Sequence, residues 1–133
     1  KQKYFDEPEL WYLIYTLISA GHEFHKNGKK IGDVRPENVF INEDGQVKVA
    51  THLTGHPRTQ IITKLLLEIT YLSAPEELKD IQFAKMEPSC DPKSAESFSI
   101  GLTCLDAGTL GSSTPLYLKS SKFDYNGLSS RLQ

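Results

Sequence analysis

The chain has 133 residues, of which 38% are hydrophobic and 24% are charged, and its net charge is −2. This length allows one hydrophobic core and at most one domain, and the composition is that of an ordinary globular protein. The slightly negative charge argues against nucleic acid and against an anionic membrane surface as partners. No apolar run approaches the ~20 residues that a membrane-spanning helix needs, so we expect no membrane segment.

The two cysteines, Cys90 and Cys104, are too few for a disulfide framework. We therefore expect a reducing compartment, with Cys104 as a small buried hydrophobic residue. Together with the lack of a visible targeting segment, this favours a cytoplasmic location, with the cytoskeleton as one candidate site. The chain starts at Lys1 in the middle of a pattern, and we expect it to be a piece of a longer polypeptide.

The first predicted element is a helix that starts after Asp6. Asp6 is a favourable N-cap residue, Pro8 suits the first turn, and Glu9 completes a capping box. Apolar or small residues recur at intervals of three and four: Leu10, Trp11, Leu13, Ile14, Leu17, Ile18, Gly21 and Phe24. Asn27 and Gly28 supply a left-handed stop. We expect a helix of about five turns that is mostly buried.

The next predicted element is a β-hairpin. Apolar residues alternate at 39–41 and 47–50, on either side of an Asp-Gly turn at 42–45. Residues 51–73 follow without a regular period and include a leucine run at 65–67. Breakers at Pro88, Asp91 and Pro92 then predict a surface loop over residues 81–92.

A further helical segment is indicated at residues 98–105. Its apolar residues lie on more than one side, which is typical of a helix buried all round: Phe98, Ile100, Leu102, Cys104 and Leu105. A Gly/Ser/Thr loop follows at 108–115, and Asp124 then caps a short final helix at 128–132.

The sequence IGDVRPENVFI at residues 31–41 resembles the catalytic loop of protein kinases. It has the family's spacing Asp-x-x-x-x-Asn, followed at once by an apolar strand. Three further segments resemble the same family: Phe-His-x-x-Gly at 24–28, Ala-Pro-Glu at 74–76, and the segment 94–102, which resembles the start of the family's central helix, so that this helix is expected to begin at Ser94. The resemblance covers nearly the whole chain.

The resemblance implies a fold of the α+β class, mainly α: the C-terminal, or large, lobe of a protein kinase with a short β-hairpin. Residues 1–133 would form one partial lobe, made of the helix before the catalytic loop, the loop, the hairpin, the activation segment, the central helix and the start of the next helix. The family's small lobe and last helices are absent from this sequence.

The resemblance also implies roles for four residues around the loop. Asp33 matches the catalytic base, and Asn38 matches the amide that binds magnesium. Arg35 stands where a Lys usually contacts the transferring phosphate, and it is always cationic. Phe40 matches the residue that packs beneath the adenine ring. Asp33 and Asn38 also suit a purely structural role, as turn residues that bond their own backbone, and we prefer that interpretation.

The preference for a structural role rests on Thr51. This residue stands at the first position of the family's Asp-Phe-Gly, 18 residues after Asp33 (51 − 33 = 18), which is the family's separation. Its neutral hydroxyl replaces the anionic oxygen that Mg²⁺ prefers. Two glutamates match structural anchors of the family: Glu76 in Ala-Pro-Glu, and Glu96 in place of the usual Asp that holds the backbone of the catalytic loop.

We therefore expect a pseudokinase-like module that acts as a scaffold or protein-binding surface without phosphotransfer. Its partners would be proteins, including those of a large assembly, with the run at 65–67 as a candidate docking surface. Two alternatives stay open: an active or weakly active ATP-dependent Ser/Thr protein kinase, and a structural subunit of a larger assembly. We expect no cofactor, with ATP and magnesium only under the kinase alternative. We expect no metal site, since the four histidines have no cysteine pair or acidic helper.

Overall fold

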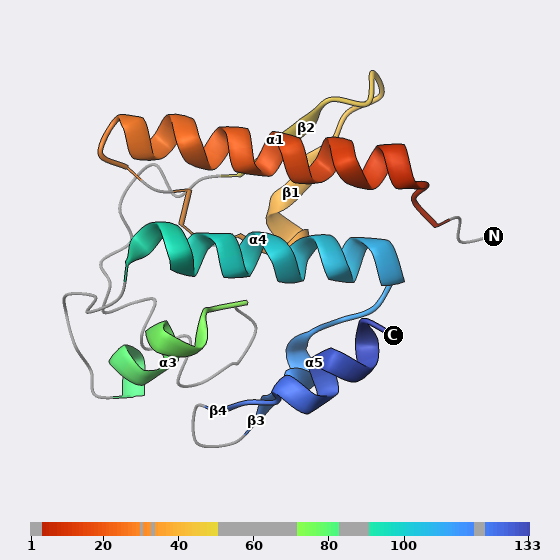
Figure 1. Cartoon of the computed structure of the whole chain (residues 1–133). Coiled ribbons are helices and arrows are strands. Elements are labelled where there is room, and N and C mark those ends of the chain that lie inside the picture. Colours follow the sequence, from red (N-terminus) through yellow and green to blue (C-terminus); the bar gives the residue numbers. More distant parts are fainter. Residues whose placement is uncertain (1–3, 30, 33, 51–71, 83–90, 119–121) are drawn as a thin grey trace.

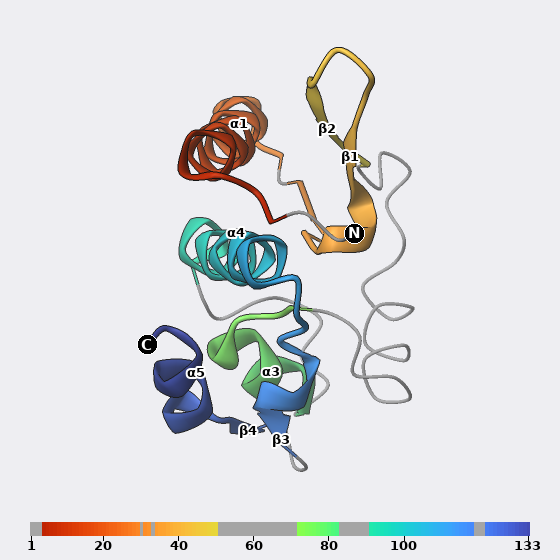
Figure 2. The same cartoon turned by 90° about the vertical axis from the view of Figure 1, so that its right-hand side faces the viewer.

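The computed structural model describes residues 4–29, 31–32, 34–50, 72–82, 91–118 and 122–133. Two long helices, α1 (Glu7–Lys26) and α4 (Pro92–Thr109), lie side by side and run in opposite directions (Figure 1). The shorter helices α3 (Pro75–Gln82) and α5 (Tyr125–Arg131) lie on the other side of α4, as Figure 2 shows. The described chain is therefore mainly helical, with α4 as its central element.

The two ends of α1 are those that the sequence predicts. The Asp6 carboxylate accepts a 2.9 Å hydrogen bond from the Glu9 backbone N–H, and the Glu9 carboxylate accepts one of 2.8 Å from the Asp6 N–H. This confirms the capping box. At the other end Asn27 is the C-cap residue, and Gly28 has a φ of +68°, in the left-handed region that ends helices.

The prediction that this first helix is mostly buried is wrong. Leu13 and Leu17 are buried on the side that faces α4 and the hairpin. Trp11 is 63% exposed, Tyr15 70% and Ile18 55%. The apolar residues of α1 occupy a wider arc than one packed side requires, so part of that arc faces solvent.

The predicted hairpin is confirmed. Strands β1 (Val39–Ile41) and β2 (Val47–Val49) pair antiparallel, with Phe40 opposite Lys48. In the turn, the Asn42 side chain accepts a 2.8 Å hydrogen bond from the backbone N–H of Gln46.

A second hairpin was absent from the sequence prediction. Strands β3 (Tyr117–Leu118) and β4 (Lys122–Phe123) are two residues long each, too short to show an alternating pattern. They lead into α5, where the Asp124 carboxylate accepts a 3.0 Å hydrogen bond from the Gly127 N–H. The predicted cap is therefore confirmed, although α5 begins at Tyr125 instead of Leu128.

The central helix begins earlier than predicted. Asp91 is its N-cap residue and accepts a 3.1 Å hydrogen bond from the Ser94 N–H, while Pro92 is its first residue. Assigning Asp91 and Pro92 to a surface loop is wrong, because Asp favours the N-cap and Pro is well suited to the first helical position. Residues 81–82 belong to α3, and 83–90 lie outside the described residues.

Two apolar clusters lie on opposite sides of α4. The first, between α4, α1 and the loop after α1, contains Leu13, Leu17, Ile31, Val34, Ile100 and Cys104. The second, between α4 and the C-terminal elements, contains Leu72, Leu78, Leu102, Leu116, Tyr117 and Phe123. Apolar residues thus lie on more than one side of α4, and Cys104 is buried, as predicted. The helix is not buried all round, since Ser97 and Gly101 are exposed.

A polar cluster holds α5 against the end of α4. Asp106 is 5% exposed and accepts hydrogen bonds from the Ser113 hydroxyl at 2.6 Å and from the Ser113 N–H at 3.0 Å. The Arg131 guanidinium donates to Asp106 at 3.2 Å, to the Ser113 hydroxyl at 2.7 Å and to the Thr109 hydroxyl at 2.9 Å. Arg131 therefore joins three oxygens from two other elements, a geometry suited to a planar guanidinium.

Candidate functional site

The kinase-like loop runs from Ile31 into β1 and is held by its apolar residues. Ile31 is 2% exposed and Val34 is 1% exposed, and both pack in the cluster between α1 and α4. A short 3₁₀ turn, η1 (Pro36–Asn38), follows, in which the Asn38 N–H donates a 2.9 Å hydrogen bond to the Arg35 carbonyl. Proline suits the start of such a turn, since its fixed φ matches and its missing N–H is not needed there.

Asn38 is fixed by the hairpin that follows it. The backbone N–H of Ala50, just after β2, donates a 2.8 Å hydrogen bond to the Asn38 carbonyl. The end of the hairpin is thereby closed onto the loop. Ala50 directly precedes Thr51 in the chain, so the neighbour of Thr51 is hydrogen-bonded to Asn38.

Glu96 joins the loop to both long helices. Its carboxylate is buried at 7% exposure and accepts a 2.9 Å hydrogen bond from the backbone N–H of Ile31. His25 Nε2, near the end of α1, lies 3.0 Å from the other carboxylate oxygen. A buried carboxylate needs such partners, because its desolvation is otherwise costly.

Gly21 makes room for the Glu96 carboxylate. A Cβ atom at this position of α1 would lie 2.9 Å from Glu96 Oε1. The absence of a side chain at Gly21 therefore allows α1 to approach α4 closely enough for the His25–Glu96 contact.

The remaining predicted site residues lie in different surroundings. Arg35 and Asn38 are half-buried, and Phe40 is 57% exposed on β1. Glu76 is exposed in the first turn of α3, after a segment whose Ser73 carbonyl accepts a 2.8 Å hydrogen bond from the Tyr117 hydroxyl. Asp33, Thr51 and the leucine run at 65–67 lie outside the described residues. Arg35, Asn38 and Phe40 are thus close neighbours along one turn and strand, whereas Glu76 belongs to another element.

Two long-range contacts could not be read from the sequence alone. In the sequence, His25 belongs to the Phe-His-x-x-Gly pattern and to the four histidines that we do not expect to bind metal, and its contact with Glu96 spans 71 positions of the chain. The Asp106–Arg131 ion pair likewise spans 25 positions. In the sequence, such a contact is indicated by an acidic residue within an apolar stretch of a helix, as at Asp106, because a buried carboxylate needs a polar partner.

Neither a metal cluster nor a membrane helix is found in the part of the chain that the structure describes. There, no group of three or more His, Cys, Asp or Glu side chains is placed to hold an ion. None of the described helices combines the length and apolar character needed to cross a bilayer.

Comparison with known proteins finds a distant similarity to a kinase. The chain is 27% identical over 103 residues to the membrane-associated tyrosine- and threonine-specific cdc2-inhibitory kinase wee-1.3 of Caenorhabditis elegans. The matched part is 77% of this chain and 14% of the length of that protein. No family model matches the chain, and no solved structure matches it. The similarity supports a protein-kinase-like relationship.

Proposed function

We propose that this chain is a pseudokinase-like module, a partial large lobe that serves as a scaffold or protein-binding surface without transferring phosphate. The observation that carries the proposal is Thr51 at the position of the metal-binding carboxylate. The Ala50–Asn38 hydrogen bond supports the proposal, because it holds the residue next to Thr51 beside the loop that contains Asn38.

The proposed loss of activity follows from the charge of the phosphates. Phosphoryl transfer needs metal ions to bridge the phosphates and to offset their negative charge. The set offered here is the Asn38 amide and the Thr51 hydroxyl, both neutral, whereas Mg²⁺ favours anionic oxygen. These residues do not fit a kinase magnesium site, so we propose that neither ATP nor magnesium is a cofactor.

In this proposal the buried contacts of the loop have a structural purpose. Glu96 holds the Ile31 backbone, and the apolar side chains of Ile31 and Val34 hold the loop between α1 and α4. We propose Glu96 as an anchor that preserves the lobe as a rigid surface; for Glu76, which is exposed in the first turn of α3, the same role rests on the resemblance alone. Asp33 and Arg35 are then vestiges of a catalytic loop.

A phosphotransfer assay tests this proposal. The chain is incubated with radiolabelled ATP, magnesium and a mixed protein substrate, beside the variants Asp33→Ala and Thr51→Asp. We expect phosphate transfer by the wild type to equal that by Asp33→Ala, at background level. Addition of Mg-ATP should not raise the melting temperature of the wild type. Transfer by the wild type that Asp33→Ala abolishes would overturn the proposal.

The proposed binding of a protein partner has its own test. A partner identified by affinity capture from cell extract should bind the purified chain in isolation, and simultaneous change of Leu65, Leu66 and Leu67 to alanine should weaken that binding at least tenfold. Equal binding by the triple variant would remove the leucine run from the proposal.

An active kinase remains the second candidate, because the relative's name describes it as a kinase and because Asp33, Arg35 and Asn38 are retained. Under this candidate Asp33→Ala abolishes phosphate transfer, and Thr51→Asp raises the rate of transfer only a little. The assay above separates the two candidates directly.

A further inference from the structure

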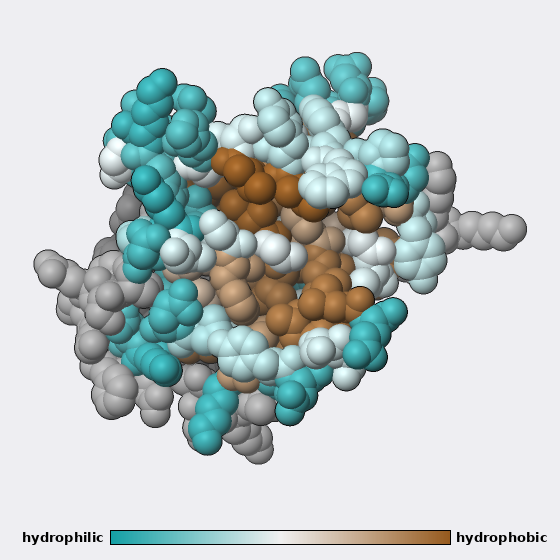
Figure 3. All heavy atoms as spheres, in the orientation of Figure 1, coloured by the Kyte–Doolittle hydropathy of each residue, from teal (hydrophilic) through white to brown (hydrophobic). Residues whose placement is uncertain are grey.

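The outward side of α1 carries an apolar stripe. Trp11, Tyr15 and Ile18 are 63%, 70% and 55% exposed, and their spacing of four and three residues places them along one face of the helix. Figure 3 shows apolar residues gathered in the band between α1 and α4 on the face turned to the viewer. Exposed apolar surface of this kind marks a site of contact with another molecule.

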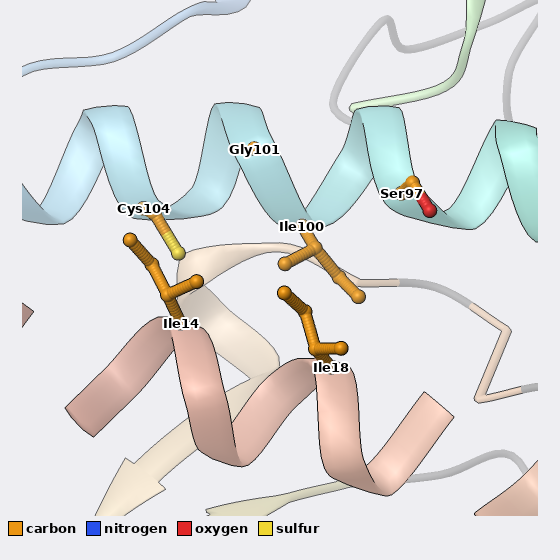
Figure 4. A pocket seen from close by; sticks show the side chains of 6 residues that line it. All are labelled: Ile14, Ile18, Ser97, Ile100, Gly101 and Cys104. Atoms are coloured by element: carbon orange, nitrogen blue, oxygen red, sulfur yellow. The ribbon is translucent and has the colours of Figure 1, made fainter. Parts of the chain in front are cut away.

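An open groove adjoins the stripe. It has a volume of about 300 Å³ and lies between α1 and α4; its lining residues are Ile14, Ile18, Ser97, Ile100, Gly101 and Cys104. In Figure 4, Ile14 and Ile18 point from α1 toward Ile100 and Cys104 on α4. The rim contributed by α4 is low, because Ser97 has a small side chain and Gly101 has none. A bulky side chain from another molecule could therefore enter beside Ile18.

Charges of opposite sign stand at the two ends of the stripe. Glu7 lies at its start, where its carboxylate accepts a 3.3 Å hydrogen bond from Trp11 Nε1. At the other end are the exposed side chains of His22 and Lys26. The positions 7, 11, 15, 18, 22 and 26 are separated by 4, 4, 3, 4 and 4 residues, a spacing that is the same when read backwards.

We propose that the stripe on α1 is the interface of a two-fold symmetric dimer, in which α1 of a second copy docks antiparallel. Reversal of the helix brings Glu7 opposite Lys26 of the second copy, Trp11 opposite His22, and Tyr15 opposite Ile18 and the groove beside it. The symmetry axis passes between residues 16 and 17, and every contact is made twice.

The charge pattern is self-complementary, and we therefore take a second copy as the occupant. An interface between identical surfaces must be self-complementary, and an acidic start with a basic end satisfies this only in the antiparallel arrangement. The exposed Lys93, at the start of α4, adds to the basic end because α4 runs opposite to α1. The dimer does not depend on whether the chain transfers phosphate.

Sedimentation equilibrium from about 1 to about 100 µM tests the proposal, a range chosen to cover weak affinities. We expect a mass that rises with concentration toward twice the 15.0 kDa of the chain. Tyr15→Arg should weaken association by roughly tenfold or more, because it places two cations beside the axis. Its control is Tyr12→Arg, which changes a tyrosine that is 47% exposed but turned away from the stripe by about 100°. Association should then equal that of the wild type.

Charge exchange gives a second test that a folding defect cannot imitate. Glu7→Lys and Lys26→Glu should each weaken self-association, and raising the salt concentration should reduce the difference from wild type. An equimolar mixture of the two variants should recover association, because both cross-interface pairs then have opposite charges. Glu23→Lys, an equal charge change at an exposed residue off the stripe, is the control and should have no effect. A monomer at every concentration, or equal effects of Tyr15→Arg and Tyr12→Arg, would overturn the proposal.

Discussion

The carboxylate of Glu96 in α4 accepts a 2.9 Å hydrogen bond from the backbone N–H of Ile31, which lies 65 positions earlier in the chain. The same carboxylate lies 3.0 Å from His25 Nε2, so a single side chain joins α1, the loop after it and α4. The contact with Ile31 is buried and the contact with His25 is part-buried, so the loss of either partner is costly.

Glu96→Ala is expected to lower the free energy of unfolding by about 2–4 kcal/mol, since it leaves the buried Ile31 N–H without its acceptor and removes the partner of His25. Urea unfolding followed by circular dichroism measures the change. The control is Glu23→Ala, at an exposed glutamate of α1, which should stay within about 0.5 kcal/mol of wild type. Equal effects of the two variants would contradict the anchoring role of Glu96.

Gly21→Ala and Gly101→Ala are expected to change stability in opposite directions. Replacing a glycine inside a helix by alanine normally stabilises by roughly 0.5–1 kcal/mol. Gly101 should follow that rule, because a Cβ there meets no atom within 4 Å. At Gly21 the Cβ would lie 2.9 Å from Glu96 Oε1, and this carboxylate cannot move aside without losing its contacts with His25 and Ile31, so overpacking should destabilise by about 1–3 kcal/mol. Urea unfolding at one protein concentration compares them, and a stabilising Gly21→Ala would refute the close approach.

Arg131→Ala is expected to loosen α5 from the end of α4. The variant removes three donated hydrogen bonds, to Asp106, Ser113 and Thr109, and leaves a buried carboxylate less well satisfied. We expect a loss of about 1–3 kcal/mol, and faster hydrogen exchange at residues 125–131. Arg131→Lys should recover little, because an ammonium cannot reproduce the planar fork. Full recovery by lysine would show that charge alone is sufficient.

The stability of the protein is expected to fall above about pH 9. Burial raises the pKa of the Cys104 thiol to about 11, from its usual 9.0. Burial, and then the charges of Glu77 and Asp106, raise the pKa of Tyr117 above its usual 10.0. Both groups lose protons at lower pH in the unfolded chain, so their contribution is complete below pH 9.0 and is lost as the pH rises through the folded values.

Comparison with Cys104→Ala isolates the thiol. This variant should be less stable at neutral pH, since it leaves a small cavity, but its free energy of unfolding should decline less steeply between the unfolded and folded pKa values of the thiol. Urea titrations at several pH values supply the slopes. Parallel curves for the variant and the wild type would exclude Cys104 as a source of the decline.

Leu110→Gly is expected to be more stable than Leu110→Ala by about 1 kcal/mol. Leu110 ends α4 with a φ of +49° and a ψ of 33°, a left-handed conformation that is unfavourable for residues with a Cβ. Both variants remove the leucine side chain, but only glycine relieves the backbone. Thermal unfolding of the two proteins provides the measurement, and equal stability would argue against strain at this position.

The features that the sequence predicts correctly are those fixed by neighbouring residues. The capping box needs only Asp6 and Glu9, and the β1–β2 hairpin needs only a turn and a few alternating residues on either side. The acidic cap of α5 is local in the same sense, because Asp124 bonds to Gly127. Such signals stay within a few positions of the chain and are strong enough to fix the element by themselves.

The features that the sequence misses depend on distant partners or on competing meanings of one residue. The exposure of Trp11 and Tyr15 depends on which elements pack against α1, and the spacing of apolar residues along the helix does not indicate those elements. Pro92 is both a helix breaker and a favourable first residue, and only the Asp91 cap decides between the two. In the candidate site, the position of Asn38 beside Ala50 follows from hairpin register, whereas the contact of His25 with Glu96 required the packing of α1 on α4.

The hydrogen bond between the Ala50 N–H and the Asn38 carbonyl closes the base of the β1–β2 hairpin, at the end opposite its turn. The tip at residues 42–45 is therefore separated from the loop by paired strands, and Gly45, with a φ of +77°, has nothing within 4 Å of its missing Cβ. A short tag or a fluorescent label inserted after Asp44 should leave the loop undisturbed. The hairpin tip thus offers a reporter position from which the assembly of this chain with other molecules could be followed.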